Sequence, residues 1–357
     1  MKKIAIALSV FGLLACKQQR ISLKFLNEYI VKDSLQIDNT VIGGISGIDY
    51  YNNQYYMVVD DAANPRILIG DIVVKNDSIQ SVSFEKVIVV DTVSQFTKNH
   101  VLDLESIFIQ DGVLNLTSEG SIQYKKDPSI FHIDTKGNFI NEVVIPNYFK
   151  ATSEAKPKHN GVFEGSSKSI DDKGFWVAME APLEADGEEP TFHETQSPVR
   201  ITYYDKNTKE ATKQYAYQLE KIDKPAKGNV NLNGVTAILE YKKDHFFIIE
   251  RIYQSGYGSH GNVVRIFKAT IDDASTNTLA IESLKNEKYT PLKKELLLDF
   301  STVENQLTDG IIDNIEAITF GPTLANGNKS LILASDDNFQ VYGKQLNQFL
   351  LIEIEEK

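Results

Sequence analysis

Short apolar runs separated by polar turns recur along the chain in one repeated pattern, clearest in 103–121, 163–182 and 314–338. A polar and a small residue are followed by an apolar run, a turn rich in Gly, Asn or Asp, and a second apolar run. Such a pattern predicts a β-hairpin. The five opening pairs are Ser46-Gly47, Glu105-Ser106, Glu164-Gly165, Asn233-Gly234 and Glu316-Ala317. The second runs end at Asp60, Glu119, Glu180, Glu250 and Asp336.

Two further strand-like runs follow most hairpins. Third strands are predicted to begin at Pro65, Pro128, Val199, Val264 and Gln348. Fourth strands are predicted over 83–91, 138–146, 213–220 and 293–300. The fifth repeat shows no fourth run, and the segment from Leu23 to Val31, which resembles 138–146, is predicted to supply it.

Repeats of about 60 residues that carry four antiparallel strands each predict an all-β fold, a β-propeller. Five repeats predict five blades, and the long stretch between Ile271 and Thr308 leaves six possible. Closure of the last blade by the N-terminal strand would remove an open sheet edge, which would otherwise promote aggregation.

The N-terminus has the pattern of a secretory signal. Lys2 and Lys3 precede an apolar run over 4–15 that is too short to span a bilayer as a helix. The ending Leu13-Leu14-Ala15-Cys16 is typical of a bacterial lipoprotein signal, in which Cys16 is lipidated. We therefore expect a signal over 1–15, a linker over 16–22 and a propeller domain over 23–357, held in the cell envelope by lipid. An ordinary signal peptide that contains Cys16 is the alternative.

Composition restricts the chemistry. The 357 residues carry a net charge of −12, and we find no run of Lys and Arg, so nucleic acid is not an expected partner. Cys16 is the single cysteine, so its lipidation would leave no thiol for a disulfide, a metal or a nucleophile. We expect a monomer that touches the membrane only through its lipid.

Up-and-down strands bring the starts of first and third strands and the ends of second strands to one face. The long connections lie on this face too, where binding sites usually occur. Asp60, Asp61, Glu316, Asp336 and Asp337 are therefore candidate ligands for a hard cation, most plausibly Ca²⁺. The candidates for general base are Glu105, Glu119, Glu164, Glu180 and Glu250. The candidates for binding an anionic substrate are Arg66, Arg200, Arg251 and Arg265. The alternative is that acids and arginines pair structurally within the blades.

Several segments resemble, in order, the family called esterase-like activity of phytase. They include "GGISGIDYYNNQYYMVVDDAANPRI", "DLESI", "TSEGS", "GFWVAMEA", "IIERI", "NIEAITFGP" and "LILASDDNF", and the likeness runs from about Gly43 to Phe349. The resemblance implies hydrolysis of phosphate or carboxylic esters by a secreted or lipid-anchored bacterial protein. Two features depart from it: Ser129 stands where the family usually has arginine, and the acidic segment 184–198 disfavours a highly charged phytate.

Two functions therefore compete. The first is a lipid-anchored hydrolase of small anionic esters, assisted by a divalent metal at the channel mouth. The second is a non-catalytic module that binds a glycan, a peptide or a partner protein. The second expects exposed aromatic residues on the loop face, and Phe192, Tyr253 and Tyr257 qualify.

Overall fold

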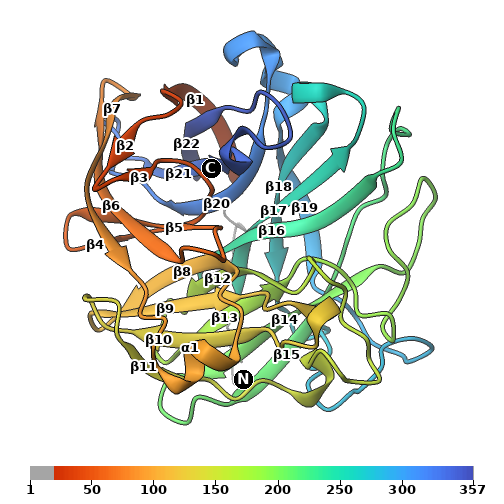
Figure 1. Cartoon of the computed structure of the whole chain (residues 1–357). Coiled ribbons are helices and arrows are strands. Elements are labelled where there is room, and N and C mark those ends of the chain that lie inside the picture. The colour runs from red at the N-terminus through yellow and green to blue at the C-terminus, as the bar shows by residue number, and fades with distance from the viewer. Residues whose placement is uncertain (1–19, 357) are drawn as a thin grey trace, which may run out of the picture.

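Each predicted hairpin forms the inner half of a four-stranded antiparallel sheet, and five such sheets surround one axis (Figure 1). The computed structural model describes residues 20–356. The first blade contains β4 (Ile45–Tyr51), β5 (Gln54–Val59), β6 (Arg66–Lys75) and β7 (Ser78–Val89). The second contains β8 (Leu104–Gln110), β9 (Val113–Ser118), β10 (Ser129–Ile133) and β11 (Phe139–Glu142).

The remaining blades repeat this order. The third contains β12 (Phe163–Lys168), β13 (Gly174–Met179), β14 (Pro198–Asp205) and β15 (Ala211–Gln218). The fourth contains β16 (Asn231–Lys242), β17 (His245–Gln254), β18 (Asn262–Thr270) and β19 (Lys293–Asp299). The fifth contains β20 (Asn314–Phe320), β21 (Lys329–Asp336), β22 (Asn347–Glu356) and β1 (Ile21–Val31). The predicted all-β propeller is confirmed, and the number of blades is five.

The N-terminal strand closes the ring, as predicted. β1 lies on the outer edge of the fifth blade, where it pairs antiparallel with β22 from Ile21 opposite Glu356 to Val31 opposite Asn347. The two ends of the described chain are thereby held in one sheet. Because 271–292 contains no strand and β19 completes the fourth blade, the sixth blade left possible by the sequence does not exist.

The burial patterns explain why the middle strands read as nearly continuous apolar runs. β13, with the sequence Gly174–Met179, is buried at every position, because neighbouring blades cover both faces of its sheet. Trp176 shows the packing: it meets Tyr203 within its own blade and Phe246 of the fourth blade edge-on. Outer strands such as β7 instead mix buried, partly buried and exposed residues.

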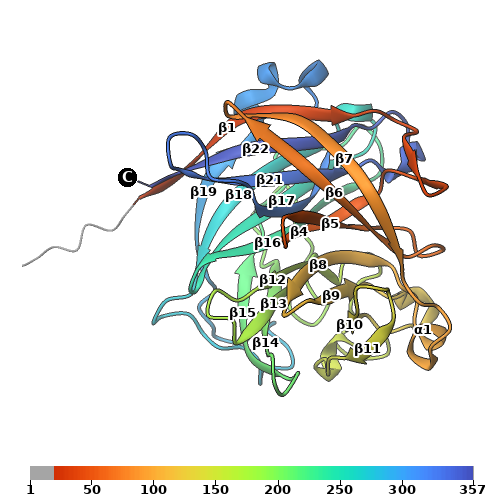
Figure 2. The same ribbon diagram turned by 90° about the vertical axis from the view of Figure 1, so that its left-hand side faces the viewer.

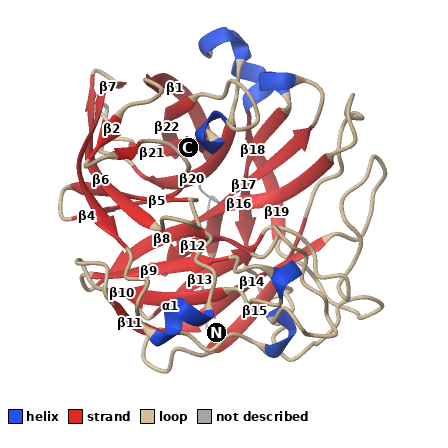
Figure 3. Cartoon of the chain, viewed as in Figure 1, coloured by secondary structure: helices blue, strands red, loops and turns tan. Residues whose placement is uncertain are grey.

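Helix is scarce among residues 20–356 (Figure 3). The only α-helix described is α1 (Gln95–Asn99), and β2 (Gln36–Ile37) with β3 (Thr40–Val41) forms a small ribbon. The 3₁₀ turns are Ile122–Tyr124, Asn147–Phe149, Gly258–His260, Phe300–Gln306, Thr308–Gly310 and Asn338–Gln340. None of the described helices has the length and apolar character needed to cross a bilayer. The predicted signal and Cys16 lie outside the described residues.

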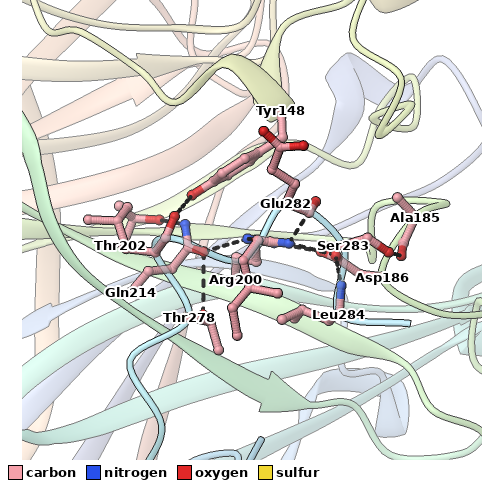
Figure 4. Close-up of polar contacts among 12 residues, drawn as sticks. Tyr148, Ala185, Asp186, Arg200, Thr202, Gln214, Thr278, Glu282, Ser283 and Leu284 are labelled. Carbon is pink, nitrogen blue, oxygen red and sulfur yellow. Dashed lines mark hydrogen bonds and ion pairs between the residues drawn. The ribbon is translucent and has the colours of Figure 1, made fainter. Parts of the chain in front are cut away.

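Arg200 anchors the long loop 271–292 of the fourth blade onto the third blade (Figure 4). Its guanidinium donates to both oxygens of Asp186 at 2.6 Å, to Gln214 at 2.8 Å and to the carbonyl of Ile281 at 2.8 Å. The loop also covers the outer edge of β15, since Leu292 N–H donates to the Ala216 carbonyl. Arg200 is fully buried. The expectation that it binds substrate is therefore wrong, because every face of the guanidinium is occupied.

We predict that Asp186→Ala lowers the free energy of unfolding by about 3–5 kcal/mol, because it leaves the buried Arg200 without its carboxylate. Urea unfolding followed by circular dichroism measures the loss. Glu184→Ala is the matched control: its partner Lys156 and Glu184 itself are both largely exposed, so removing that pair should cost about 1 kcal/mol or less. Equal losses for the two variants would show that the Arg200 network does not hold the loop.

Candidate active site

Every inner strand carries a β-bulge near its start. The register shifts by one residue between Ile45 and Gly47, and at the matching place in the other four inner strands. A bulge leaves an extra residue and turns its side chain out of the normal alternation. The extra residues are Ser46, Glu105, Glu164, Thr236 and Glu316.

The five bulge residues form one ring around the axis. A second ring is formed by the residues at the ends of the second strands. Four of its positions are acidic: Asp60, Glu119, Glu180 and Asp336. The register of β16 and β17 pairs Gly234 with Arg251, so Arg251 holds the equivalent position in the fourth blade. Comparison of the five repeats in the sequence placed Asn233-Gly234 and Glu250 at these positions. It is wrong for this blade, where Thr236-Ala237 and Arg251 correspond.

The acids of these rings converge near the axis. Carboxylate oxygens of Asp60, Asp103 and Glu105 all lie within 4.8 Å of one another, and so do those of Glu105, Glu119 and Glu164. Glu105 exposes 6% of its surface and Glu119 4%. We call the eight carboxylates the axial acid cluster: Asp60, Asp103, Glu105, Glu119, Glu164, Glu180, Glu316 and Asp336.

Sequence reasoning missed Asp103. It precedes the strand β8, and the repeat pattern singled out Glu105 as the start of the hairpin. The two residues are separated by one position in "DLES", and the bulge turns Glu105 toward the same group of oxygens as Asp103. An acid two residues before a predicted bulge is the signal that would have found it.

Arg251 is the cation within this cluster. Its Nη2 lies 3.3 Å from Oε1 of Glu180 and 3.4 Å from Oε1 of Glu316. Its buried Nε has no hydrogen-bond partner among the described residues. Burial opposes the charge of Arg251, but the attraction of Glu316, Glu180 and the other acids raises its pKa, so it stays a cation. One arginine cannot balance eight carboxylates.

Burial and mutual repulsion keep the acids partly protonated. Burial, with repulsion from Glu180, raises the pKa of Glu119 to about 8. Burial also raises the pKa of Glu316 to about 8, although Arg251 acts in the opposite direction. The pKa values of Glu105 and Glu164 lie well above the ordinary range for the same reasons. Carboxylates crowded together in this way share protons unless a cation joins them.

The donor set fits a hard divalent cation. Carboxylate and amide oxygens are the ligands such cations prefer, and no thiol or imidazole belongs to the two tight groups of three. Asn314 adds an amide at the rim: its Nδ2 donates to Glu316 at 2.8 Å, while its buried Oδ1 has no hydrogen-bond partner among residues 20–356. The cluster can therefore hold a metal ion.

Glu250 lies outside the cluster, in a polar contact between the third and fourth blades. Its carboxylate accepts hydrogen bonds from Tyr217 Oη at 2.7 Å, Asn233 Nδ2 at 2.9 Å and Lys294 Nζ, and from one backbone N–H. Lys294 also sits over the Tyr217 ring. With its oxygens committed in this way, Glu250 is a structural residue, and its predicted place beside the other glutamates is wrong.

Four more predicted residues make local contacts. Arg66 donates to Asp61 at 2.6 Å and lies over the Phe339 ring. Arg265 binds Asp299 at 2.8 Å, and also Asp223. Asp337 is saturated by neutral donors, including Gly44 N–H at 2.8 Å. Arg66 and Arg265, like Arg200, therefore pair structurally with acids, as the alternative prediction expected. Of the predicted arginines only Arg251 reaches the cluster.

Two basic side chains of the loop 150–162 influence the cluster. Burial raises the pKa of Asp103, whereas its hydrogen bond with Asp60 and the charge of His159 act against this increase. Burial likewise raises the pKa of Glu180, and the charges of Arg251 and Lys158 act against this increase. Lys158 Nζ also pairs with Glu189 at 3.0 Å. The mouth thus combines buried acids with Arg251 and a partly cationic rim. Such a site can bind a cation and an anionic group together.

A model of the phytase-like family, described as esterase-like activity of phytase, matches residues 40–339. The chain belongs to this phytase-like family. The match covers all five inner strands and both rings of the axial acid cluster. A search of curated proteins gave no significant match.

Solved structures resemble this phytase-like chain only in fold. An exo-1,5-alpha-L-arabinanase from a bovine ruminal metagenomic library has 9% identity over 89% of this chain and 95% of that chain, with a TM-score of 0.41. An endo-1,4-beta-xylanase from Bacteroides thetaiotaomicron has 11% identity over 82% and 84%, with a TM-score of 0.41. A member of the duf4221 family from Bacteroides vulgatus has 11% identity over 96% and 99%, with a TM-score of 0.39. Similarity at this level gives no information about function.

We predict that the metal-free protein loses stability as the pH rises. Glu119 and Glu316 have ordinary pKa values of 4.5 that rise to about 8 on folding. A raised folded-state pKa gives stability that is complete below about pH 4.5 and is lost through about pH 8. The melting temperature in chelator should therefore fall between pH 5 and pH 8.5, and it should fall less in Glu119→Gln/Glu316→Gln. A melting temperature that increases over this range would contradict the prediction.

Proposed function

We propose that the protein is a divalent-metal-assisted hydrolase of phosphate or related esters, and that its active site is the axial acid cluster. The observation that carries the proposal is the convergence of eight carboxylates, six of them buried, around one arginine. Structural acids elsewhere in this chain have internal donors, as Glu250 and Asp337 do. The axial acids have too few, and a bound cation would supply the missing charge.

Asp60, Asp103 and Glu105 would hold the metal, with Glu119 and Glu164 as further ligands, because these five make up the groups of closely spaced oxygens. A hard cation such as Ca²⁺ would polarise the ester group and neutralise developing charge. Asp336 borders this set and, with Asn314, completes its polar wall. Binding would displace protons from these acids, because metal ligands must be deprotonated.

Arg251 would bind the anionic group of the substrate. Its buried Nε has no partner among the described residues, so it can donate to a phosphate or carboxylate oxygen. Glu180 or Glu316, both beside Arg251, would take a proton from the attacking water. The water oxygen forms a bond to phosphorus or to the acyl carbon, the ester bond breaks, and the leaving alcohol accepts that proton. The products are an acid and an alcohol.

A non-catalytic binding module is the second candidate, and one observation favours it. Phe192 exposes 41% of its surface on the loop between β13 and β14, at the acidic end of the axis. Exposed aromatic rings are suited to stacking on a sugar or a peptide side chain. Tyr257 is less free, because Lys224 and Lys227 both lie over its ring. The two functions differ in turnover, which the experiment below measures.

We also propose that lipid on Cys16 holds the protein in the cell envelope as a monomer. β1 begins at Ile21, at the end of the axis opposite the axial acid cluster, because Ile21 pairs with Glu356 and not with the start of β22. Figure 2 shows the end of β22 on the left and α1, which precedes β8 at the acidic end, on the right. An anchor at Cys16 would therefore turn the acidic mouth away from the bilayer.

We predict that the protein hydrolyses a phosphate or acyl ester in the presence of Ca²⁺ and loses this activity in chelator. A screen of chromogenic esters with and without EDTA measures turnover. Glu105→Gln/Glu164→Gln should lower kcat/KM by about 100-fold or more, since it removes two cluster carboxylates. Calorimetry of Ca²⁺ binding in two buffers of different ionisation enthalpy should show proton release.

The matched control is Glu184→Gln, which removes an exposed acid from a loop on the same face and should leave turnover unchanged. Saturable glycan or peptide binding with no turnover on any ester would favour the binding module. Turnover that persists in chelator, or in the double variant, would contradict the proposed site.

For the anchor, we predict that Cys16→Ser moves the protein from the membrane fraction to the soluble fraction. Cell fractionation and labelling with a fatty-acid analogue measure the change. Wild-type protein that takes up no label would contradict lipidation and leave the ordinary signal peptide as the explanation.

A further inference from the structure

A second pocket lies at the other end of the axis, where the inner strands finish. It has a volume of about 630 Å³ and is lined by the last residues of all five inner strands, from Ile48 in β4 to Phe320 in β20. We call it the strand-end pocket. Glu316 lies near the start of β20 and Phe320 ends it, so the pocket and the axial acid cluster lie at opposite ends of the same strand. Its volume is typical of sites for small organic molecules.

The carboxylates of the strand-end pocket are already compensated within the protein. Asp49 accepts hydrogen bonds from the backbone N–H groups of Ile109 at 2.7 Å and Tyr50 at 2.8 Å. Glu240 likewise accepts from the N–H groups of Ile170 at 2.7 Å and Asp244 at 2.8 Å. Each carboxylate fastens one segment to another, and the N–H groups offset part of the cost of its burial.

The two exposed acids at the rim share a lysine outside the pocket. Lys206 lies 2.5 Å from Asp111 and 3.4 Å from Asp172, and Gln110 donates to Asp172 at 2.8 Å. With these pairs formed, the rim has no acid that lacks a donor. In the axial acid cluster, by contrast, one arginine lies among eight carboxylates.

Lys168 is the uncommitted charge of the strand-end pocket. It is exposed, and among residues 20–356 it has no hydrogen bond or ion pair through its ammonium group. It lines the pocket, and its charge acts on both Asp49 and Asp172. Tyr50 exposes 45% of its surface and Ile170 50%, so two large apolar side chains border the same opening. Exposed apolar groups beside a pocket mark a binding surface.

We propose that the strand-end pocket binds a small organic monoanion with an apolar body. Its acid group would pair with Lys168, and its body would lie against Ile170, Tyr50 and the apolar ends of the inner strands. A cation is disfavoured because the acids of the pocket already have donors. The proposal is independent of catalysis at the axial acid cluster.

The test is a fluorescence titration of the full chain with 8-anilinonaphthalene-1-sulfonate, an aromatic monoanion. Saturable binding is expected, displaced by dodecanoate and not by dodecylammonium. Lys168→Glu and Ile170→Asp should each weaken binding by about tenfold or more, which corresponds to about 1.4 kcal/mol. Both side chains are exposed, so the variants should fold, and urea unfolding verifies this. Lys173→Glu is the control, because it reverses a nearby exposed charge outside the pocket and should leave binding unchanged.

Three results would overturn the proposal. The first is equal binding by wild type and Lys168→Glu. The second is displacement of the probe by Ca²⁺ or recovery by EDTA, which would place it at the acidic mouth. The third is association with anionic phospholipid vesicles and no saturable binding of the soluble probe, which would identify a membrane surface. The Glu105→Gln/Glu164→Gln variant should lose ester hydrolysis and still bind the probe. The failure of one proposal can therefore be told apart from the failure of the other.

Discussion

A closed ring of five sheets must bring the starts of five inner strands to one axis, and this constraint determines the rest of the molecule. β1 enforces it by completing the fifth blade from the far end of the chain. Once the ring is closed, side chains from residues as distant as Asp60 and Asp336 share one small volume. The bulges at Glu105, Glu164 and Glu316 turn additional acids into it. The crowding of charge at the acidic mouth is thus a consequence of topology, which the local sequence of any blade does not reveal.

The sequence predicted the fold well because the propeller repeats a local signal. Each hairpin carries its own turn and its own pair of apolar runs, and the continuous runs of strands such as β13 reflect burial between blades. The closing strand was predictable because 23–31 resembles a fourth strand of the repeat. The same reasoning failed in the fourth blade. Asn233-Gly234 imitates the opening pair of the other repeats, while the bulge that defines the true register falls at Thr236, three residues later.

Roles of individual charged residues were harder to predict, because partners come from distant loops. Arg200 lies near the start of β14, where it is enclosed by Asp186 and by carbonyls more than 80 residues further on, whereas Arg251 of β17 reaches the axis. Neither position reveals which distant groups the guanidinium meets. Asp61 and Asp337, selected as doubled acids, are satisfied by Arg66 and by backbone and amide donors. The first acid of each doublet, Asp60 or Asp336, belongs to the cluster instead, since successive residues at a strand end point to different sides.

The two ends of the axis differ in how their carboxylates are neutralised, and this difference separates their chemistry. Asp49 and Glu240 each accept two backbone N–H groups, and the ammonium group of Lys168 at that mouth has no hydrogen bond or ion pair within residues 20–356. In the described part of the chain Glu105 and Glu164 have no comparable donors, and their pKa values rise with burial and mutual repulsion. Burial raises the pKa of Asp49 and Glu240 too, but their backbone donors act against the increase, whereas repulsion between acids adds to it at Glu105 and Glu164. If both proposals hold, one propeller presents a cation-binding mouth and an anion-binding mouth, with the choice made by hydrogen bonds within each end and not by the overall negative charge of the chain.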